Sequence, residues 1–552
     1  MTNRTWAPWM AAVFTLGAGS ALLAGTPVPQ APQTGGPPRL IVVLVSDQFR
    51  ADYVTRYSKQ WTKGLRRLLD QGAVFTEAAY PFFVTKTCAG HSTIGTGRFP
   101  ASHGMIDNSW YDRATRRSRV CTDDPSATAV PFAGGAARER HGVSQMQGWT
   151  LADEVRRHTN DRSRVVTLSL KPRSAIGLAG RPGPGVMAIW KEDNGPWSTS
   201  TVYAQTPWPD VDDFVKAHPV ADAFGTTWDR MLPVASYLND DDGPGEGARA
   251  VFPYRLVGNN NIPDSTFQEA WEKSPLSNAY LGEMAKMLVE RQALGQRDTT
   301  DFLGVSFSAL DLVGHTTGPR SHEVQDVMVQ LDVVIGDLLA TLDRLVGKDR
   351  YVVAFSSDHG VPDLPEQITA DGGEAGRIRT AAIRDAIETA LDRLIDDATW
   401  IANITTPYIY FAVDRNERVE TAAGGRDAVT RAILSVPGIE RVVWPNEIRA
   451  ADGRDPLLLA LRRSYFDGRS GDVAFVIKRN WVPQATGTTH GSPYDYDQRV
   501  PLIIAGPGIT AGSYKNAATP ADIAPTLAHL AGVPMTQTDG RVLREALTRP
   551  PR

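Results

Sequence analysis

The 552-residue chain has few cysteines, no strong charge of either sign and only one long apolar stretch. Its 58 Lys and Arg residues nearly balance its 62 Asp and Glu residues, which gives a net charge of −4, and no long run carries one sign. Because no basic field is present to attract phosphate backbones, we expect no nucleic acid partner. Internal repeats are also absent. The 42% hydrophobic content is that of a globular protein, long enough for one large domain with insertions or for two or three domains.

Only two cysteines occur, Cys88 and Cys121, so a disulfide-rich scaffold is excluded. In an exported protein the two can form a disulfide, which would brace the segment around Cys88. The alternative is two unrelated small buried residues. The sequence leaves both interpretations open.

The one long apolar stretch lies at the N-terminus. Arg4 is followed by no charged residue until Arg39, and residues 6–24 are mostly apolar. This pattern predicts a secretory signal peptide over residues 1–25 and a linker over 26–38, and hence a periplasmic or secreted protein. The alternative is a retained anchor helix of about 19 residues, although a proline and several glycines disfavour it. The stretch has no cysteine and therefore no lipoprotein cleavage site.

Apolar runs and helical patterns alternate along the rest of the chain. The runs that read as buried strands of a parallel sheet are 39–46, 165–170, 302–308, 351–355 and 500–504. Helical patterns include 63–71 and 323–345. This alternation predicts an α/β fold with a doubly wound, mostly parallel sheet sandwiched by helices.

Two regions interrupt the alternation. The first, 181–285, is rich in Pro, Gly, Trp and Asn and predicts a loop-rich insertion near the active site. The second, 365–480, mixes helical runs and short strands and predicts an inserted cap subdomain. The core would then have three parts, 39–180, 286–364 and 481–552.

Acidic residues and histidines follow the ends of several predicted strands. Since the carboxyl ends of parallel strands open onto one crevice, these side chains can converge there. Each of these residues, taken alone, is also consistent with a helix cap or a surface residue that has no catalytic role. Together their oxygen and nitrogen atoms suit two zinc ions. The candidate ligands are Asp47, Asp311, His315, Asp358, His359 and His490.

A threonine and two cations complete the candidate site. The hydroxyl of Thr87 is a weak nucleophile that needs a metal ion or a base to activate it. A helix that starts just after Thr87 would direct backbone N–H groups at a phosphate. Lys171 and Arg173 follow a predicted strand, and two cations suit a dianionic phosphate better than a monoanionic diester. The alternatives without a catalytic role are a helix cap for Thr87 and a solvated charged loop for Lys171 and Arg173.

Three other motifs are incomplete. The stretch 90–94 (GHSTI) lacks the last glycine of the serine-hydrolase elbow, which argues against Ser92 as a nucleophile. Cys88 lacks the Pro and Arg that follow a sulfatase cysteine. The pair His322 and Glu323 lacks a second histidine at zincin spacing, so we expect both at the surface.

Taken together, these residues resemble the alkaline phosphatase superfamily, and within it the threonine-nucleophile alkaline phosphatases, which are close to the nucleotide pyrophosphatase/phosphodiesterase branch. The resemblance covers the chain from about Arg39 to its end and is weakest in the 365–480 insertion. One departure is Ala89, where family members usually carry Pro. The resemblance implies two Zn²⁺, one held by Asp47, Asp358, His359 and Thr87, and the other by Asp311, His315 and His490.

The same resemblance implies a function. Asn108, 21 residues after Thr87, matches the phosphate-contacting asparagine, and the Lys171 and Arg173 pair marks the monoesterase branch. We therefore expect an exported zinc-dependent alkaline phosphatase that hydrolyses small phosphate monoesters through a phosphothreonine intermediate. The alternatives are a phosphodiesterase or nucleotide pyrophosphatase on the same scaffold and, more remotely, a catalytically dead binding protein of the envelope or a metal-independent serine hydrolase.

Overall fold

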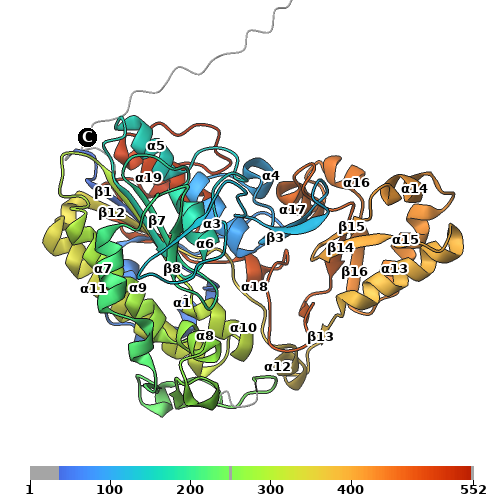
Figure 1. Ribbon diagram of the computed structural model, residues 1–552, viewed down its shortest axis with the longest axis horizontal. Coiled ribbons are helices and arrows are strands. Elements are labelled where there is room, and N and C mark those ends of the chain that lie inside the picture. The colour runs from blue at the N-terminus through green and yellow to red at the C-terminus, as the bar shows by residue number, and fades with distance from the viewer. Residues whose placement is uncertain (1–35, 248–250, 549–552) are drawn as a thin grey trace, which may run out of the picture.

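The computed structural model describes residues 36–247 and 251–548, so the predicted signal peptide (1–25) and most of the predicted linker (26–38) lie outside the described residues. A ten-stranded sheet forms the main body of the described chain (Figure 1). In spatial order its strands are β20 (Gly512–Tyr514), β2 (Ala73–Phe75), β19 (Leu502–Ala505), β12 (Tyr351–Ser356), β1 (Leu40–Ser46), β11 (Asp301–Phe307), β6 (Val165–Ser169), β7 (Val186–Lys191), β8 (Trp197–Ser200) and β5 (Ala129–Pro131).

The five central strands, from β12 to β7, run parallel, while β19 and β8 join them antiparallel. Successive residues of β1 alternate between two hydrophobic cores because side chains on a strand point to opposite faces. Ile41 and Val43 enter one core, and Leu40 and Val42 enter the other. The predicted doubly wound, mostly parallel sheet is therefore confirmed.

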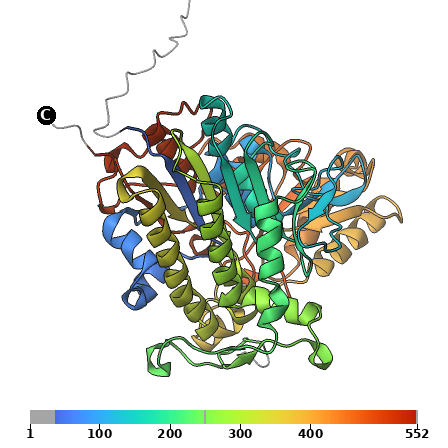
Figure 2. The same ribbon diagram turned by 60° about the vertical axis from the view of Figure 1, so that its left-hand side comes forward.

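Helices cover both faces of this sheet. Figure 2 shows the long helices α9 and α11, green and olive, running along one face. The main helical layer on that face consists of α2 (Gly64–Gln71), α9 (Pro275–Arg291) and α11 (His322–Leu345). The opposite face carries α3 (Thr87–Thr96), α5 (Leu151–His158), α6 (Pro172–Ala179) and α19 (Ile523–Ala531). No helix in the described part of the chain is both long and apolar enough to cross a membrane.

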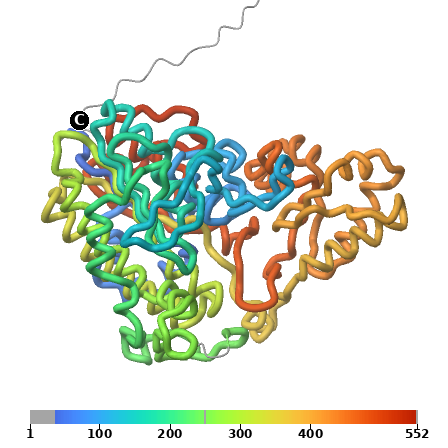
Figure 3. The backbone as a smooth tube through the Cα atoms, viewed as in Figure 1, coloured from blue at the N-terminus to red at the C-terminus, as the bar shows by residue number. Residues whose placement is uncertain are grey.

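A second unit, orange in Figure 1, has a sheet and a hydrophobic core of its own. Its strands, in order, are β14 (Ile401–Thr405), β15 (Tyr408–Phe411), β17 (Val473–Ile477) and β16 (Ile439–Val443). Its larger helices are α13 (Thr380–Leu394) and α15 (Gly425–Leu434). Figure 3 shows the chain leaving the main body for this unit and returning from it.

The region 181–285 contains more regular structure than its predicted loop-rich character implies. Strands β7 and β8 lie within it and belong to the main sheet, and α9 runs across its predicted end at residue 285. The flanking prolines and glycines obscured these strands, because such residues normally mark turns. The rest of the region contains short elements: α7 (Pro209–Ala217), β9 (Thr227–Trp228), β10 (Tyr254–Arg255) and α8 (Ser265–Lys273).

Candidate active site

The carboxyl ends of the central parallel strands bring the predicted ligands together. Asp47 directly follows β1, and Asp358 and His359 follow β12 after one intervening residue. All three side chains are buried. The Nε2 atom of His359 lies 3.4 Å from Oδ1 of Asp47 and 3.3 Å from Oδ2 of Asp358. These three residues form one group whose ligand atoms are close enough to share a metal ion.

A second group of possible ligands lies beside the first. Asp311 lies on α10 (Ala309–Thr317), which follows β11, and it groups with His490 and with His359. His359 joins this group as well because its ring stacks on that of His490, with centroids 3.4 Å apart. His315, which the sequence places with Asp311 and His490, is adjacent: its Nε2 lies 3.1 Å from Oδ1 of Asp311.

Each of the three histidines is oriented by a backbone carbonyl. A carbonyl can only accept, so the Nδ1 atom of each ring donates and its Nε2 is left with a lone pair for a metal. Burial lowers the pKa of His359 and of His490, which favours the neutral form that metals bind. The Nδ1 contacts are His315 to Thr488 O (2.8 Å), His359 to Gly360 O (3.0 Å) and His490 to Thr85 O (2.7 Å).

The buried carboxylates carry excess negative charge. Burial, together with the neighbouring carboxylates of Asp311 and Asp358, raises the pKa of Asp47. The ammonium of Lys171 lies 2.6 Å from Oδ2 of Asp47 and also contacts Asp311, so it bridges the two groups. Asp47 Oδ1 accepts no hydrogen bond from the described residues, while Asp358 Oδ2 lies 3.2 Å from Nδ1 of His91. An unpaired buried oxygen beside neutral imidazoles fits a divalent cation, and this ligand chemistry suits zinc.

Thr87 lies at the edge of this cluster as the first residue of α3, as the predicted helix start requires. Its hydroxyl oxygen is 3.5 Å from Nε2 of His359. The helix approaches the segment after β12 so closely that a Cβ at Gly90 would lie 2.3 Å from the carbonyl oxygen of Asp358. A glycine at this position therefore lets α3 reach the candidate ligands.

The first turn of α3 differs from the expected phosphate cradle. The N–H of Cys88 donates to Oδ1 of Asn108 at 2.9 Å, so a side chain already uses this amide. Arg173 lies in the first turn of α6, and its Nε is buried without a hydrogen-bond partner among the described residues. Asn108 thus contacts the residue next to Thr87, and Arg173 lies two residues after Lys171, which contacts the candidate ligands.

Two further residues, neither of them among the predicted site residues, contact the candidate ligands. The side chain of Gln48 donates to Oδ1 of Asp311 at 2.7 Å, and its backbone N–H donates to Oδ1 of Asp358 at 3.2 Å. His91 lies one helical turn after Thr87, with its Nδ1 3.2 Å from Oδ2 of Asp358. The four-residue spacing from Thr87 is a signal that sequence analysis can use to find His91. Gln48 carries no comparable signal.

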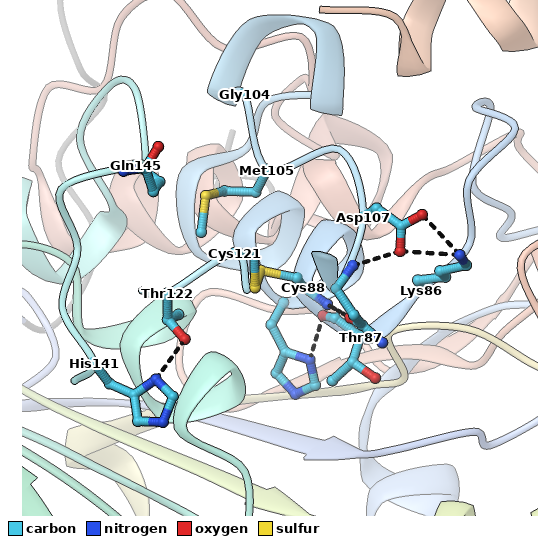
Figure 4. Close-up of a disulfide and its surroundings, with 12 residues drawn as sticks. Lys86, Thr87, Cys88, Gly104, Met105, Asp107, Cys121, Thr122, His141 and Gln145 are labelled. Carbon is cyan, nitrogen blue, oxygen red and sulfur yellow. Dashed lines mark hydrogen bonds and ion pairs between the residues drawn. A yellow bond between two sulfur atoms is a disulfide. The ribbon is translucent and has the colours of Figure 1, made fainter. Parts of the chain in front are cut away.

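Cys88 and Cys121 form a disulfide, which resolves the alternatives that the sequence left open (Figure 4). Both residues are fully buried. The bridge joins the residue next to Thr87 to the segment that carries Asn108.

A family model described as type I phosphodiesterase / nucleotide pyrophosphatase matches residues 41–494. The chain belongs to this family. Alkaline phosphatase PhoV of Synechococcus elongatus is 30% identical over 516 residues, covering 90% of this chain and 91% of the relative. Alkaline phosphatase PafA of Elizabethkingia meningoseptica is 29% identical over 532 residues, covering 91% and 95%. The predicted membership of the alkaline phosphatase superfamily is confirmed.

Solved structures agree with this assignment. The crystal structure of wild-type alkaline phosphatase PafA matches with a TM-score of 0.85 at 28% identity and covers 95% of this chain and 100% of that one. Murine ectonucleotide pyrophosphatase / phosphodiesterase 5 matches with a TM-score of 0.53 at 14% identity, a likeness that concerns the fold alone.

Proposed function

We propose that this protein is an exported, zinc-dependent alkaline phosphatase that hydrolyses phosphate monoesters through a phosphothreonine intermediate. Relatives named alkaline phosphatase match about nine-tenths of the chain, which supports a phosphoric monoester hydrolase. The observation that carries the proposal is the position of Thr87, whose hydroxyl lies 3.5 Å from the imidazole that both ligand groups share.

Each ligand group has a proposed ion. Asp47, Asp358 and His359, with Thr87 as the fourth ligand, would hold one Zn²⁺. Asp311, His315 and His490 would hold the other. When bound, two such ions supply Lewis acidity at the attacking and leaving oxygens.

The residues of the chain then carry out two displacements. The Oγ of Thr87 forms a bond to phosphorus while the bond from phosphorus to the ester oxygen breaks. Thr87 gives up its hydroxyl proton to solvent, and the leaving oxygen takes up a proton and departs as the free alcohol. Water afterwards cleaves the phosphothreonine, which releases phosphate and restores the hydroxyl. Holding Thr87 at the start of a rigid helix reduces the entropic cost of the first step.

Three side chains would bind the transferred phosphoryl group. Oδ1 of Asn108 accepts from the Cys88 N–H, so its Nδ2 remains as a donor for a phosphate oxygen. Lys171 and Arg173 bring two positive charges to the same end of the sheet. Two cations favour the dianion of a monoester over the monoanion of a diester.

A phosphodiesterase on the same scaffold is the alternative, and the description of the family model favours it. The test is the ratio of kcat/KM for p-nitrophenyl phosphate to that for bis(p-nitrophenyl) phosphate, measured on zinc-loaded protein. We expect the monoester to be the better substrate by orders of magnitude. A ratio below one would replace our proposal with the diesterase.

Export is supported by the sequence of residues 1–25 and by the disulfide, because disulfides persist in oxidising compartments. Mass spectrometry of protein collected from the periplasm or medium should give a mature N-terminus close to residue 26. Protein retained in the cytoplasm with an intact N-terminus would contradict this part of the proposal.

A further inference from the structure

Both chain neighbours of the proposed nucleophile are fixed to one segment, residues 107–121 (Figure 4). On one side of Thr87, the ammonium of Lys86 lies 2.9 Å and 2.7 Å from the two carboxylate oxygens of Asp107. On the other side, Cys88 is bonded covalently to Cys121. Thr87 therefore has a fixed residue on either side, and both anchors lead to the same segment.

That segment also carries Asn108, and the anchors contact it directly. Its backbone N–H donates to Oδ1 of Asp107 at 2.6 Å, and its carbonyl accepts from the N–H of Cys121 at 2.9 Å. Its side-chain Oδ1 accepts from the N–H of Cys88 at 2.9 Å. Asn108 is thus held through its backbone by Asp107 and Cys121, and through its amide by Cys88.

The intervening residues form a short hairpin of β3 (Ser109–Asp112) and β4 (Arg117–Val120), so the segment returns to Cys121 as a hydrogen-bonded unit. Asp107 and both cysteines are buried. Burial raises the pKa of Asp107, and the ion pair with Lys86 opposes that effect. The ammonium of Lys86 therefore favours the ionised form of the Asp107 carboxylate with which it pairs.

We infer that Asp107 and the Cys88–Cys121 disulfide are positioning residues, which set the place and orientation of the Asn108 amide relative to the Thr87 hydroxyl. The inference rests on the proposed function, because it assigns Asn108 to the phosphoryl oxygens. Without Asp107 and the disulfide, Oδ1 of Asn108 no longer has a fixed donor and its Nδ2 no longer has a fixed direction. A displacement of about 1 Å at such a group can cost up to about a hundredfold in rate.

The test is a double-mutant cycle on zinc-loaded enzyme. The variants are Asp107→Asn, which keeps the shape and removes the charge, and Cys88→Ser with Cys121→Ser. Each is made in the natural background and together with Asn108→Ala. The readouts are kcat/KM for p-nitrophenyl phosphate and the zinc content of the protein.

We expect each change to lower kcat/KM by about ten- to a hundredfold in the natural background, with zinc content unchanged. In the Asn108→Ala background the same changes should lower it by less than about twofold, because the group that they position is gone. Asp396→Asn is the control. Asp396 pairs with Arg418 at 2.6 Å in the second unit, and removing this ion pair should leave kcat/KM unchanged in both backgrounds.

Equal losses in both backgrounds would overturn the inference and leave only a structural role for these residues. No loss in the natural background would overturn it too. If the serine double variant does not fold, the cycle with Asp107→Asn decides by the same criterion. Natural protein that is folded and zinc-loaded but has no turnover would instead refute the proposed function.

Discussion

Replacing Lys171 with Met should destabilise the protein strongly in the presence of a chelator and only weakly in the presence of zinc. The ammonium of Lys171 lies between two buried carboxylates, Asp47 and Asp311, at 2.6 Å from the first. Burial alone would lower the pKa of Lys171, but the two carboxylates raise it, so the lysine is a cation in the folded protein. Methionine keeps the length of the side chain and removes the charge.

The size of the effect follows from the cost of leaving a buried charge without its partner, about 3–5 kcal/mol. For about 500 folded residues the unfolding entropy is roughly 1 kcal/mol/K, so the midpoint temperature in EDTA should fall by roughly 3–5 °C. With zinc bound, divalent charge replaces the missing ammonium, and the fall should be less than half as large.

The measurement is thermal unfolding of both proteins, followed by tryptophan fluorescence, in EDTA and in zinc. Lys191→Met is the matched control, because Lys191 is equally buried and pairs with Glu272 away from the candidate ligands. The control should lose the same stability under both conditions. If Lys171→Met also loses the same amount in EDTA and zinc, the two carboxylates are not metal ligands and the reasoning fails.

Three further predictions test other parts of the account. Chelation should abolish hydrolysis of p-nitrophenyl phosphate, and zinc should restore it better than magnesium does; activity that survives exhaustive chelation would revive a metal-independent hydrolase. Replacing Lys171 and Arg173 with Ala should lower kcat/KM for the monoester far more than for the diester, and equal losses would make the pair structural. Burial lowers the pKa of His103 to about 3, so its stabilising contribution is present above pH 6.5 and is lost as the pH falls toward 3. Between pH 7.5 and 5 the natural protein should lose about 2 kcal/mol more unfolding free energy than His103→Gln in urea titrations, and equal losses would contradict burial of a neutral imidazole.

The sheet was predictable because its strands are apolar on both faces. The run 39–46 became β1, and 351–355 became β12, each buried along its whole length. Parallel strands of this kind expose their carboxyl ends at one edge, so the positions of Asp47 and Asp358 followed from the sequence alone. The strand at 186–191 was missed because prolines and glycines surround it.

Contacts between distant segments were not predictable. His322 and Glu323 were expected at the surface, but both are buried, and the hydroxyl of Tyr254 donates to Glu323 at 2.6 Å. The partner comes from a short strand whose position depends on the tertiary fold. The ion pair between Asp107 and Lys86 was missed for the same reason, because the sequence separation of the two residues does not indicate an ion pair.

The most direct test of the proposed mechanism is the covalent intermediate itself. Zinc-loaded enzyme is mixed with a phosphate monoester, quenched in acid within its first turnovers, digested and analysed by mass spectrometry. We expect a phosphate on Thr87, in a peptide that also contains Cys88, and none in the Thr87→Ala variant. A phosphate on any other residue, or full turnover by Thr87→Ala, would contradict the proposed mechanism.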